Sequence, residues 1–199
     1  VLIASFTLSN TEAGLLTVFL QAPSVLQPFI GHAADQLNLR YLVILAPAIT
    51  AATMSLLGGA PGYLGLAVFL ILTGISSASL HAVGPVMVGR LSGSRLGRGM
   101  GWWMVGGELG RTLGPIVIVT ALQFLTLGNT PVLMIAGVLM SISLFILLRD
   151  MVGRPERSVD ALPWRGALRA MVPILPLLGS IVVVRAFMLS ALTTSLPTF

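Results

Sequence analysis

Residues 42–59 (LVILAPAITAATMSLLGG) and residues 131–148 (PVLMIAGVLMSISLFILL) are apolar almost throughout and contain no charged residue. An α-helix crosses a hydrocarbon core about 30 Å thick with about 20 apolar residues, so each stretch is close to the length that spans a membrane. A transmembrane β-strand would instead alternate apolar and polar residues over about ten positions, which neither stretch does. The two stretches therefore indicate a helical membrane protein and argue against a transmembrane β-barrel.

The rest of the chain follows the same pattern. Of its 199 residues, 56% are hydrophobic and 9% are charged, against about 25% charged residues in an ordinary soluble domain. Six apolar segments of spanning length follow one another, over residues 13–34, 41–60, 63–89, 99–125, 130–148 and 170–196. Most connectors are short, so sequential helices are expected to be antiparallel neighbours. We predict an all-α, polytopic transmembrane helix bundle with six membrane spans.

The arginines follow the order of the predicted spans. The sequence has no lysine, and its 11 basic residues and 6 acidic residues give a formal net charge of +5. Alternate connectors contain Arg40, Arg90, Arg95, Arg98, Arg149, Arg154, Arg157, Arg165 and Arg169. Because cytoplasmic loops are enriched in basic residues, these connectors are expected in the cytoplasm and the N-terminus outside. The charge thus indicates a multi-pass protein of the cell membrane, surrounded by lipid, and no nucleic-acid partner is expected.

The connector 150–168 differs in composition from the segments around it. It combines arginine, aspartate, glutamate and proline, which is typical of a segment between two bundles. We predict an N-terminal bundle over residues 1–149, a cytoplasmic linker over 150–168, and the first helix of a second bundle over 169–199. Since the predicted path begins outside and stops at the outer end of a span, the chain is expected to be a fragment of a longer protein.

Three charged residues lie well inside the predicted spans, namely Glu108, Arg111 and Arg185. A charge at the centre of a transmembrane helix costs about 2.5–3.5 kcal/mol on insertion scales, so each should face protein or water and have a partner. Glu108 and Arg111 are three positions apart and can pair directly. The pair is either part of a proton and substrate pathway or a structural ion pair. Arg185 needs a partner on another helix or an anionic ligand.

Several uncharged polar and aromatic residues are further candidates. His81, in the run SSASLHAVG, is either a proton carrier, since an ordinary imidazole titrates near pH 6.5, or a hydrogen-bond partner of a neighbouring helix. Gln21 and Gln27 either line a cavity or join helices. Trp102 and Trp103, near a cytoplasmic end of a span, are expected to form part of an aromatic belt, with stacking on a substrate as the alternative.

The span that contains the charged pair also contains a regular series of glycines. Gly106, Gly110 and Gly114 recur at a spacing of four residues, which predicts a ridge for close helix approach. At 100° per residue they share one face of the helix, while the charged pair and Pro115 lie on the other side. We therefore expect the ridge to contact a neighbouring helix and the charged pair to face a polar cavity.

The sequence lacks the usual signs of cofactor, metal or nucleotide chemistry. It has no cysteine, which excludes disulfides, thiol nucleophiles and cysteine-ligated metal sites. It also has no Walker A pattern, metal-ligand cluster or dinucleotide glycine signature. No cofactor, no metal and no ATP-driven step are expected.

Two motifs resemble those of the major facilitator superfamily. Residues 31–40 (GHAADQLNLR) resemble the family's cytoplasmic loop motif through Gly31, Asp35 and Arg40, but lack its second glycine and two of its basic residues. Residues 105–115 (VGGELGRTLGP) are similar to the glycine and Gly-Pro pattern on the fifth helix of proton-coupled drug antiporters in this superfamily. The matching positions are Gly106, Gly107, Gly110, Gly114 and Pro115.

Across essentially its whole length, the chain is similar to the fosmidomycin-resistance efflux branch of the superfamily. The resemblance implies helices two to seven of twelve, with the first helix and most of the second bundle missing. That branch commonly follows its helix-four histidine with proline and glutamate, whereas His81 is followed by Ala82 and Val83. One hypothesis is that Glu108 and Arg111 have taken over the charge function of the absent glutamate.

The resemblance implies a secondary active transporter, not an enzyme, that exports a small molecule or drug by proton antiport with alternating access. Glu108 would alternate between Arg111 and a proton, which would free Arg111, with Arg185, to hold an anionic substrate. Asp35 and Arg40 would act at a cytoplasmic gate. Protons and a small molecule are the expected partners.

Two alternatives from other classes remain open at this point. A non-transporting membrane sensor or scaffold could have the same sequence features. An intramembrane serine hydrolase would use His81 with Ser76, Ser77 or Ser79, although the sequence lacks a G-x-S-x-G element.

Overall fold

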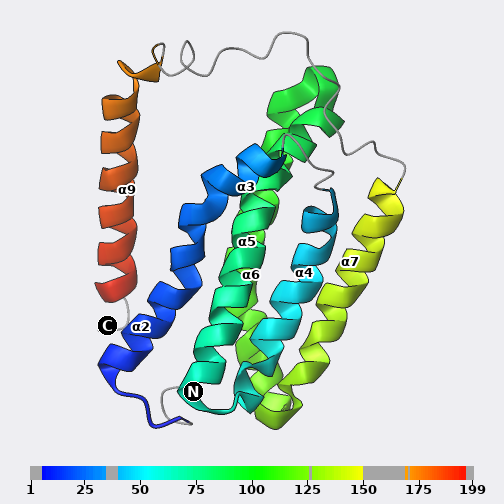
Figure 1. Ribbon diagram of the computed structural model, residues 1–199, viewed down its shortest axis with the longest axis vertical. Helices are drawn as coiled ribbons and strands as arrows, with labels where there is room; N and C mark the ends of the chain where they lie inside the picture. Colours follow the sequence, from blue (N-terminus) through cyan, green and yellow to red (C-terminus); the bar gives the residue numbers. More distant parts are fainter. Residues whose placement is uncertain (1–5, 35–39, 126, 150–168, 170, 196–199) are drawn as a thin grey trace. The chain divides into compact units, whose positions relative to one another are not determined.

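The computed structural model describes residues 6–34, 40–125, 127–149, 169 and 171–195. Every element in these ranges is helical (Figure 1). The α-helices are α2 (Asn10–Gln21), α3 (Gln27–Ala34), α4 (Arg40–Ser55), α5 (Gly62–Ser92), α6 (Leu96–Phe124), α7 (Met134–Leu148) and α9 (Leu175–Ser195). The 3-10 segments are η1 (Ala22–Leu26), η2 (Leu56–Gly59), η3 (Gly93–Arg95) and η4 (Leu127–Leu133).

The chain divides into two compact units, Val1–Pro155 and Glu156–Phe199. The first unit contains α2 to α7, and the second contains α9. The predicted linker 150–168 lies outside the described residues, so the division into bundle, linker and second-bundle helix stays a prediction.

Four helical runs are long and apolar enough to cross a membrane, namely Asn10–Ala33, Arg40–Gly59, Gly62–Phe124 and Asn129–Leu148. The third run has 63 residues because η3 joins α5 directly to α6, so it covers two of the predicted spans. In α9, Leu175–Met188 is a shorter apolar run among the residues whose side chains are described. The all-helical membrane architecture is thus confirmed, whereas the number of six spans stays a prediction.

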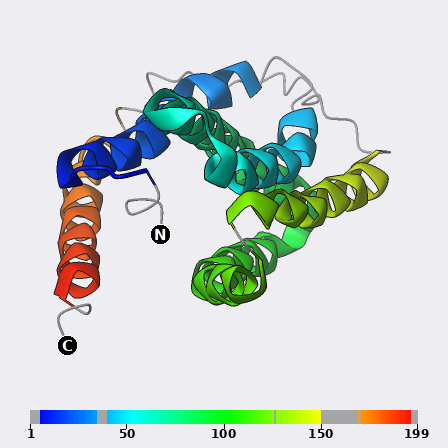
Figure 2. The ribbon, with the colours of Figure 1, turned by 90° about the horizontal axis from the view of Figure 1, so that it is seen from below.

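Helix α5 is the centre of the first unit. It packs against α2, α3, α4 and α6, while α4 also packs along α7 (Figures 1 and 2). The end of α3, the start of α4, the η3 turn and the end of α7 lie at the same end of this unit (Figure 1). The arginine-containing connectors that adjoin these elements therefore meet this unit at one end.

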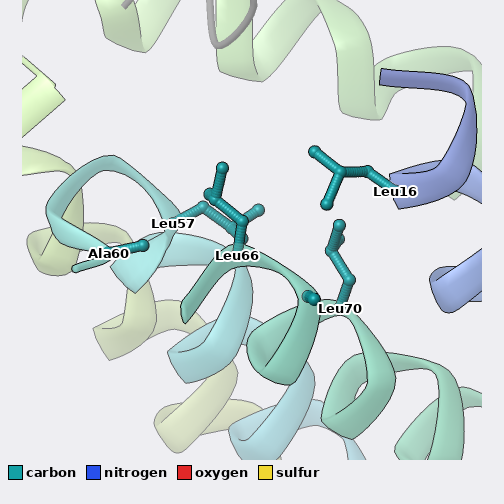
Figure 3. Close-up of a cluster of buried hydrophobic side chains, with 6 residues drawn as sticks. Leu16, Leu57, Ala60, Leu66 and Leu70 are labelled. Carbon is teal, nitrogen blue, oxygen red and sulfur yellow. The ribbon is translucent and has the colours of Figure 1, made fainter. Parts of the chain in front are cut away.

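Two apolar clusters hold these helices together. One joins α2, η2 and α5 through side chains that point towards one another in Figure 3, and its buried members are Leu16, Leu57, Ala60, Leu66, Ala67 and Leu70. The other joins α4, α5 and α7 through Val43, Ile44, Val83, Met87 and Leu148. Helix α5 contributes to both clusters. The N-terminal part of α5 therefore packs against α2, and the C-terminal part of α5 packs against α4 and α7.

Two of the prolines inside predicted spans lie where the local hydrogen bonding is described. The span expected over residues 13–34 is divided by η1, which has Pro23 in its first turn. In α4, Pro47 lies inside the helix, where a proline removes one intrahelical hydrogen bond. The next backbone amide, that of Ala48, donates to Ser141 Oγ of α7 at 2.9 Å. A hydroxyl group of α7 therefore accepts a hydrogen bond from the backbone of α4 next to Pro47.

A glycine allows α7 to approach α4 closely beside the same proline. A Cβ atom added at Gly137 would overlap both the Ala51 side chain and the Pro47 carbonyl oxygen. Only a residue without a side chain leaves room for the backbone of α4 here. Gly137 and Ser141, one turn apart on α7, thus form a single contact surface for α4.

Candidate functional site

Glu108 and Arg111 form an ion pair on α6. Arg111 Nη1 lies 3.1 Å from Glu108 Oε1 and 3.3 Å from Glu108 Oε2, so one guanidinium nitrogen donates to both carboxylate oxygens. The side chains of Arg111 and Glu108 are 69% and 60% exposed within this chain. The spacing of three residues thus brings the two charges together. The described residues do not cover the pair.

The glycines of the predicted ridge on α6 are also open. No residue of α6 is buried within the chain. A Cβ added at Gly106, Gly107, Gly110 or Gly114 would meet no described atom within 4 Å. The helix partner expected for this ridge is therefore not among the described residues, and the close approach stays a prediction, as does the polar cavity expected on the other side.

His81 lies on the side of α5 that faces α6. Its ring centroid is 6.5 Å from that of Trp103, and the two ring planes are nearly perpendicular at 84°. The six-membered ring of Trp103 lies over Gly84, where an added Cβ would overlap it. Trp103 was expected in an aromatic belt, but in the structure it packs between helices. The glycine three positions after His81 was the signal in the sequence for this contact.

The serines near His81 are bonded elsewhere. Ser76 Oγ donates to the Ala46 carbonyl of α4 at 3.0 Å, and Ser79 Oγ donates to the Ile75 carbonyl at 2.8 Å. Both serines are buried, whereas His81 is exposed. Among the described residues, no hydrogen bond joins His81 to a serine hydroxyl, so the structure offers no nucleophile and base pair here.

A line of hydroxyl groups joins α4 to α5, which the sequence interpretation did not anticipate. Thr50 Oγ1 donates to Ser76 Oγ at 3.0 Å, and the hydroxyl oxygens of Thr53 and Thr73 are 2.6 Å apart. The two residues on each helix are three positions apart, which was the available sign of their pairing. Hydrogen bonds of this kind join transmembrane helices without exposing polar groups to lipid.

The loop motif of residues 31–40 is described in part. Gly31 is half-buried in α3, and Asp35 lies outside the described residues. Arg40 begins α4, and its Nη1 donates to the carbonyl oxygen of Arg149 at 2.6 Å. Its Nη2 donates to the Tyr41 hydroxyl at 3.0 Å. Since Arg149 is the C-cap of α7, Arg40 places a cation at the negative end of that helix.

The remaining candidates lie apart from one another in the chain. Gln21 ends α2 and is exposed, whereas Gln27 begins α3 and is half-buried, with η1 between them. Arg185 is exposed on α9 in the second unit. The structure thus brings together Glu108 with Arg111, and His81 with Trp103, while the other predicted site residues are placed singly.

Long apolar helices that carry charged and polar residues within their length are the architecture of an integral membrane transporter. The family model described as Major Facilitator Superfamily matches residues 1–199, the whole chain. The chain belongs to this superfamily. Its membership identifies an integral membrane protein of the transporter class and argues against the serine hydrolase alternative.

Two curated relatives are similar to parts of the chain. The fosmidomycin resistance protein of Escherichia coli (strain K12) is 26% identical over 137 residues, which cover 68% of this chain and 34% of the relative. The uncharacterized MFS-type transporter YfnC of Bacillus subtilis (strain 168) is 28% identical over 128 residues, 63% of this chain and 30% of the relative. The matched region thus spans about a third of each relative. No solved structure matches the chain.

Proposed function

We propose that this chain is part of a secondary transporter that exports a small molecule in exchange for protons. The observation that carries the proposal is the Glu108–Arg111 ion pair, at 3.1 Å, on a helix of membrane-spanning length in a chain of this superfamily. The similarity to a fosmidomycin resistance protein supports drug export as the direction. In this proposal the first unit is most of the N-terminal bundle, and α9 begins the second bundle.

The ion pair supplies a proton-dependent switch. An ionised Glu108 is held by Arg111, whereas a protonated Glu108 no longer attracts the guanidinium. Arg111 is then free to hold an anionic group of the substrate, with Arg185 as a second cation of the pathway. His81, Gln21 and Gln27 provide further polar contacts along it. Alternating access of two bundles about a central site couples the two events.

The arginine connectors are proposed to face the cytoplasm, with the protein in the plasma membrane. The loop that contains Gly31, Asp35 and Arg40 then acts as a cytoplasmic gate. Arg40 supports this assignment because it already bridges two elements, the start of α4 and the end of α7.

Replacement of Glu108 tests the proton switch. The intact protein is placed in inverted vesicles, and fosmidomycin is the first probe because a relative is named for resistance to it. In pH-jump assays, Glu108→Gln should reduce proton-driven uptake at least tenfold, because a neutral amide cannot carry the proton. Glu12→Gln is the matched control, since Glu12 is a carboxylate in the capping box of α2. Unchanged coupling in Glu108→Gln would refute the proposed switch, and no flux in the wild-type protein would favour a sensor or scaffold.

Replacement of Asp35 tests the gate. Asp35→Asn should shift the balance between inward-facing and outward-facing states, measured by site-specific labelling, while the amount of protein in the membrane changes less than twofold. An equal fall in labelling and in protein level would indicate a folding role instead.

A further inference from the structure

The contact between α5 and α6 is built from a single face of α5. His81, Gly84 and Val88 are three and four positions apart, so they share one side of the helix. At the level of Val88, the partner is Gly99 of α6, where an added Cβ would lie 3.4 Å from a Val88 methyl group. One turn further along α6, Trp103 covers Gly84 and contacts His81.

Beyond Trp103 the two helices no longer touch at the equivalent positions. The next residues of α6 on that side are glycines, and an added Cβ at Gly106, Gly107 or Gly110 would meet no described atom within 4 Å. His81 and Trp103 therefore mark the point where α5 and α6 separate. His81 is exposed, so its ring is reachable at this point.

His81 also lies at nearly the same depth as the ion pair. Residue 81 is eleven positions before Ser92, the end of α5, and residue 108 is twelve positions after Leu96, the start of α6. At 1.5 Å per residue these separations are about 17 Å and about 18 Å from the turn that joins the two helices. The imidazole and the Glu108 carboxylate are thus at similar heights on adjacent helices.

We propose that Trp103 is a positioning residue for His81: the indole, seated on Gly84, holds the imidazole at the separation of α5 and α6, where His81 exchanges protons during transport. The inference rests on the proposed function, because it deepens the role of His81 in the proton pathway. A T-shaped pair at 6.5 Å orients a neutral imidazole. A protonated imidazole is instead attracted to the face of an indole. Proton uptake therefore changes the geometry of the pair.

Other titratable or charged groups lie on α5 and on the elements around it, but none of those described contacts His81. They are Glu12 of α2, His32 of α3, Arg40 and Tyr41 of α4, Arg95 of η3, and Arg98, Glu108 and Arg111 of α6, with Tyr63 and Arg90 on α5 itself. Among the described residues, no hydrogen bond or ion pair joins any of them to His81. Trp103 is the described side chain in ring contact with it.

Indole fluorescence tests the contact without any transported compound. Contact with a protonated imidazole quenches an indole, so Trp103 emission should report the protonation of His81. The intact protein in lipid nanodiscs carries Trp102→Phe and Trp164→Phe, in addition to replacement of any tryptophan outside this chain. We expect emission to fall at least twofold between pH 8 and pH 5, and His81→Asn to abolish the change. A matched protein that retains Trp102 in place of Trp103 should show no such change.

Two variants separate positioning from a structural role. Gly84→Ala inserts a Cβ into the indole and should reduce the pH-dependent quenching at least twofold. Trp103→Leu, with Trp102→Leu as its control, should shift the pH profile of proton-driven fosmidomycin uptake by at least half a pH unit. Should Gly84→Ala fail to fold, Trp103→Leu alone decides the question.

The possible failures are distinguishable. If emission does not respond to His81, or if Trp103→Leu leaves the pH profile of a proton-coupled transporter unchanged, the positioning role is wrong. If emission responds as expected but the wild-type protein transports nothing, the proposed function fails and His81 with it as a transport residue.

Discussion

Individual side chains of small or polar residues determine how close the helices of the first unit lie. Ser141 serves the Ala48 amide of α4, and Ser76 serves the Ala46 carbonyl on the other side of the same helix. Both serines are buried. Because lipid offers no hydrogen-bond partner, the bonds between these hydroxyl groups and the backbone near Pro47 join α4 to α5 and α7 without leaving either hydroxyl unpaired.

Removal of one such hydroxyl should weaken the bundle. Ser141→Ala leaves the Ala48 amide without its partner on α7 and should lower the free energy of unfolding by about 1 kcal/mol. Ser143→Ala is the control, because Ser143 is exposed and donates to the Leu139 carbonyl of its own helix. Unfolding of the intact protein in mixed micelles, titrated with SDS, measures both values. Equal losses in the two variants would show that the contact with α4 contributes nothing.

At this scale the sequence predicts contacts within one helix better than contacts between helices. The spacing of Glu108 and Arg111 was sufficient to predict their pairing, because helical periodicity fixes neighbours three positions apart. The place of Trp103 was not predictable in the same way. It depends on which residue of α5 lies opposite, and that register is set by the η3 turn.

At the scale of elements, the start of one helix stabilises the end of another. Arg40, the first residue of α4, donates to the carbonyl of Arg149 at the C-terminal end of α7. Four carbonyl groups at a helix C-terminus lack intrahelical donors, and a cation there is favourable. The motif residue Arg40 therefore stabilises the C-terminal end of α7, in addition to its proposed role in the gate.

Loss of this cap should loosen the last turn of α7. Arg40→Gln removes the cation and should reduce the local stability of that turn by about 0.3–1 kcal/mol. Hydrogen–deuterium exchange of the peptide that ends at Arg149 should become severalfold faster, while peptides from the middle of α7 are unchanged. Arg40→Lys, which keeps the charge, should have a smaller effect. Unaltered exchange in Arg40→Gln would show that the cap is dispensable.

Hydropathy predicted where the helices run, but not how each is interrupted. The apolar segments 41–60 and 130–148 correspond closely to the runs Arg40–Gly59 and Asn129–Leu148. Within the first predicted span, however, η1 separates α2 from α3. Average hydrophobicity over a window does not register a change of local hydrogen bonding, which Pro23 and its neighbours cause here.

At the scale of the whole molecule, the arginine pattern predicts which connectors face the cytoplasm, and cysteine labelling can test this prediction. The chain has no cysteine, so single replacements provide unique labelling sites within it, once any cysteine elsewhere in the protein is removed. Ser94→Cys in η3 should react with a membrane-impermeant maleimide only from the cytoplasmic side. Pro61→Cys, in the connector before α5, should react only from outside. The reverse pattern would invert the proposed orientation.

Features of the molecule that depend on local sequence could be predicted, whereas features that depend on contacts between distant segments could not. The helical class and the transporter family followed from composition and local motifs, and both are confirmed. No described residue meets the α6 glycines, and Arg185 lies in a separate unit, so local patterns could indicate only the kind of environment that these residues need.

The hydrogen bond beside Pro47 has a consequence for biosynthesis. Ser141 lies 93 residues after Ala48, so α4 leaves the ribosome and enters the translocon long before α7 has been synthesised. During that interval the hydrogen bond between the Ala48 amide and α7 cannot form. The contact between α4 and α7 beside Pro47 is therefore made late, after the chain between the two helices has been synthesised.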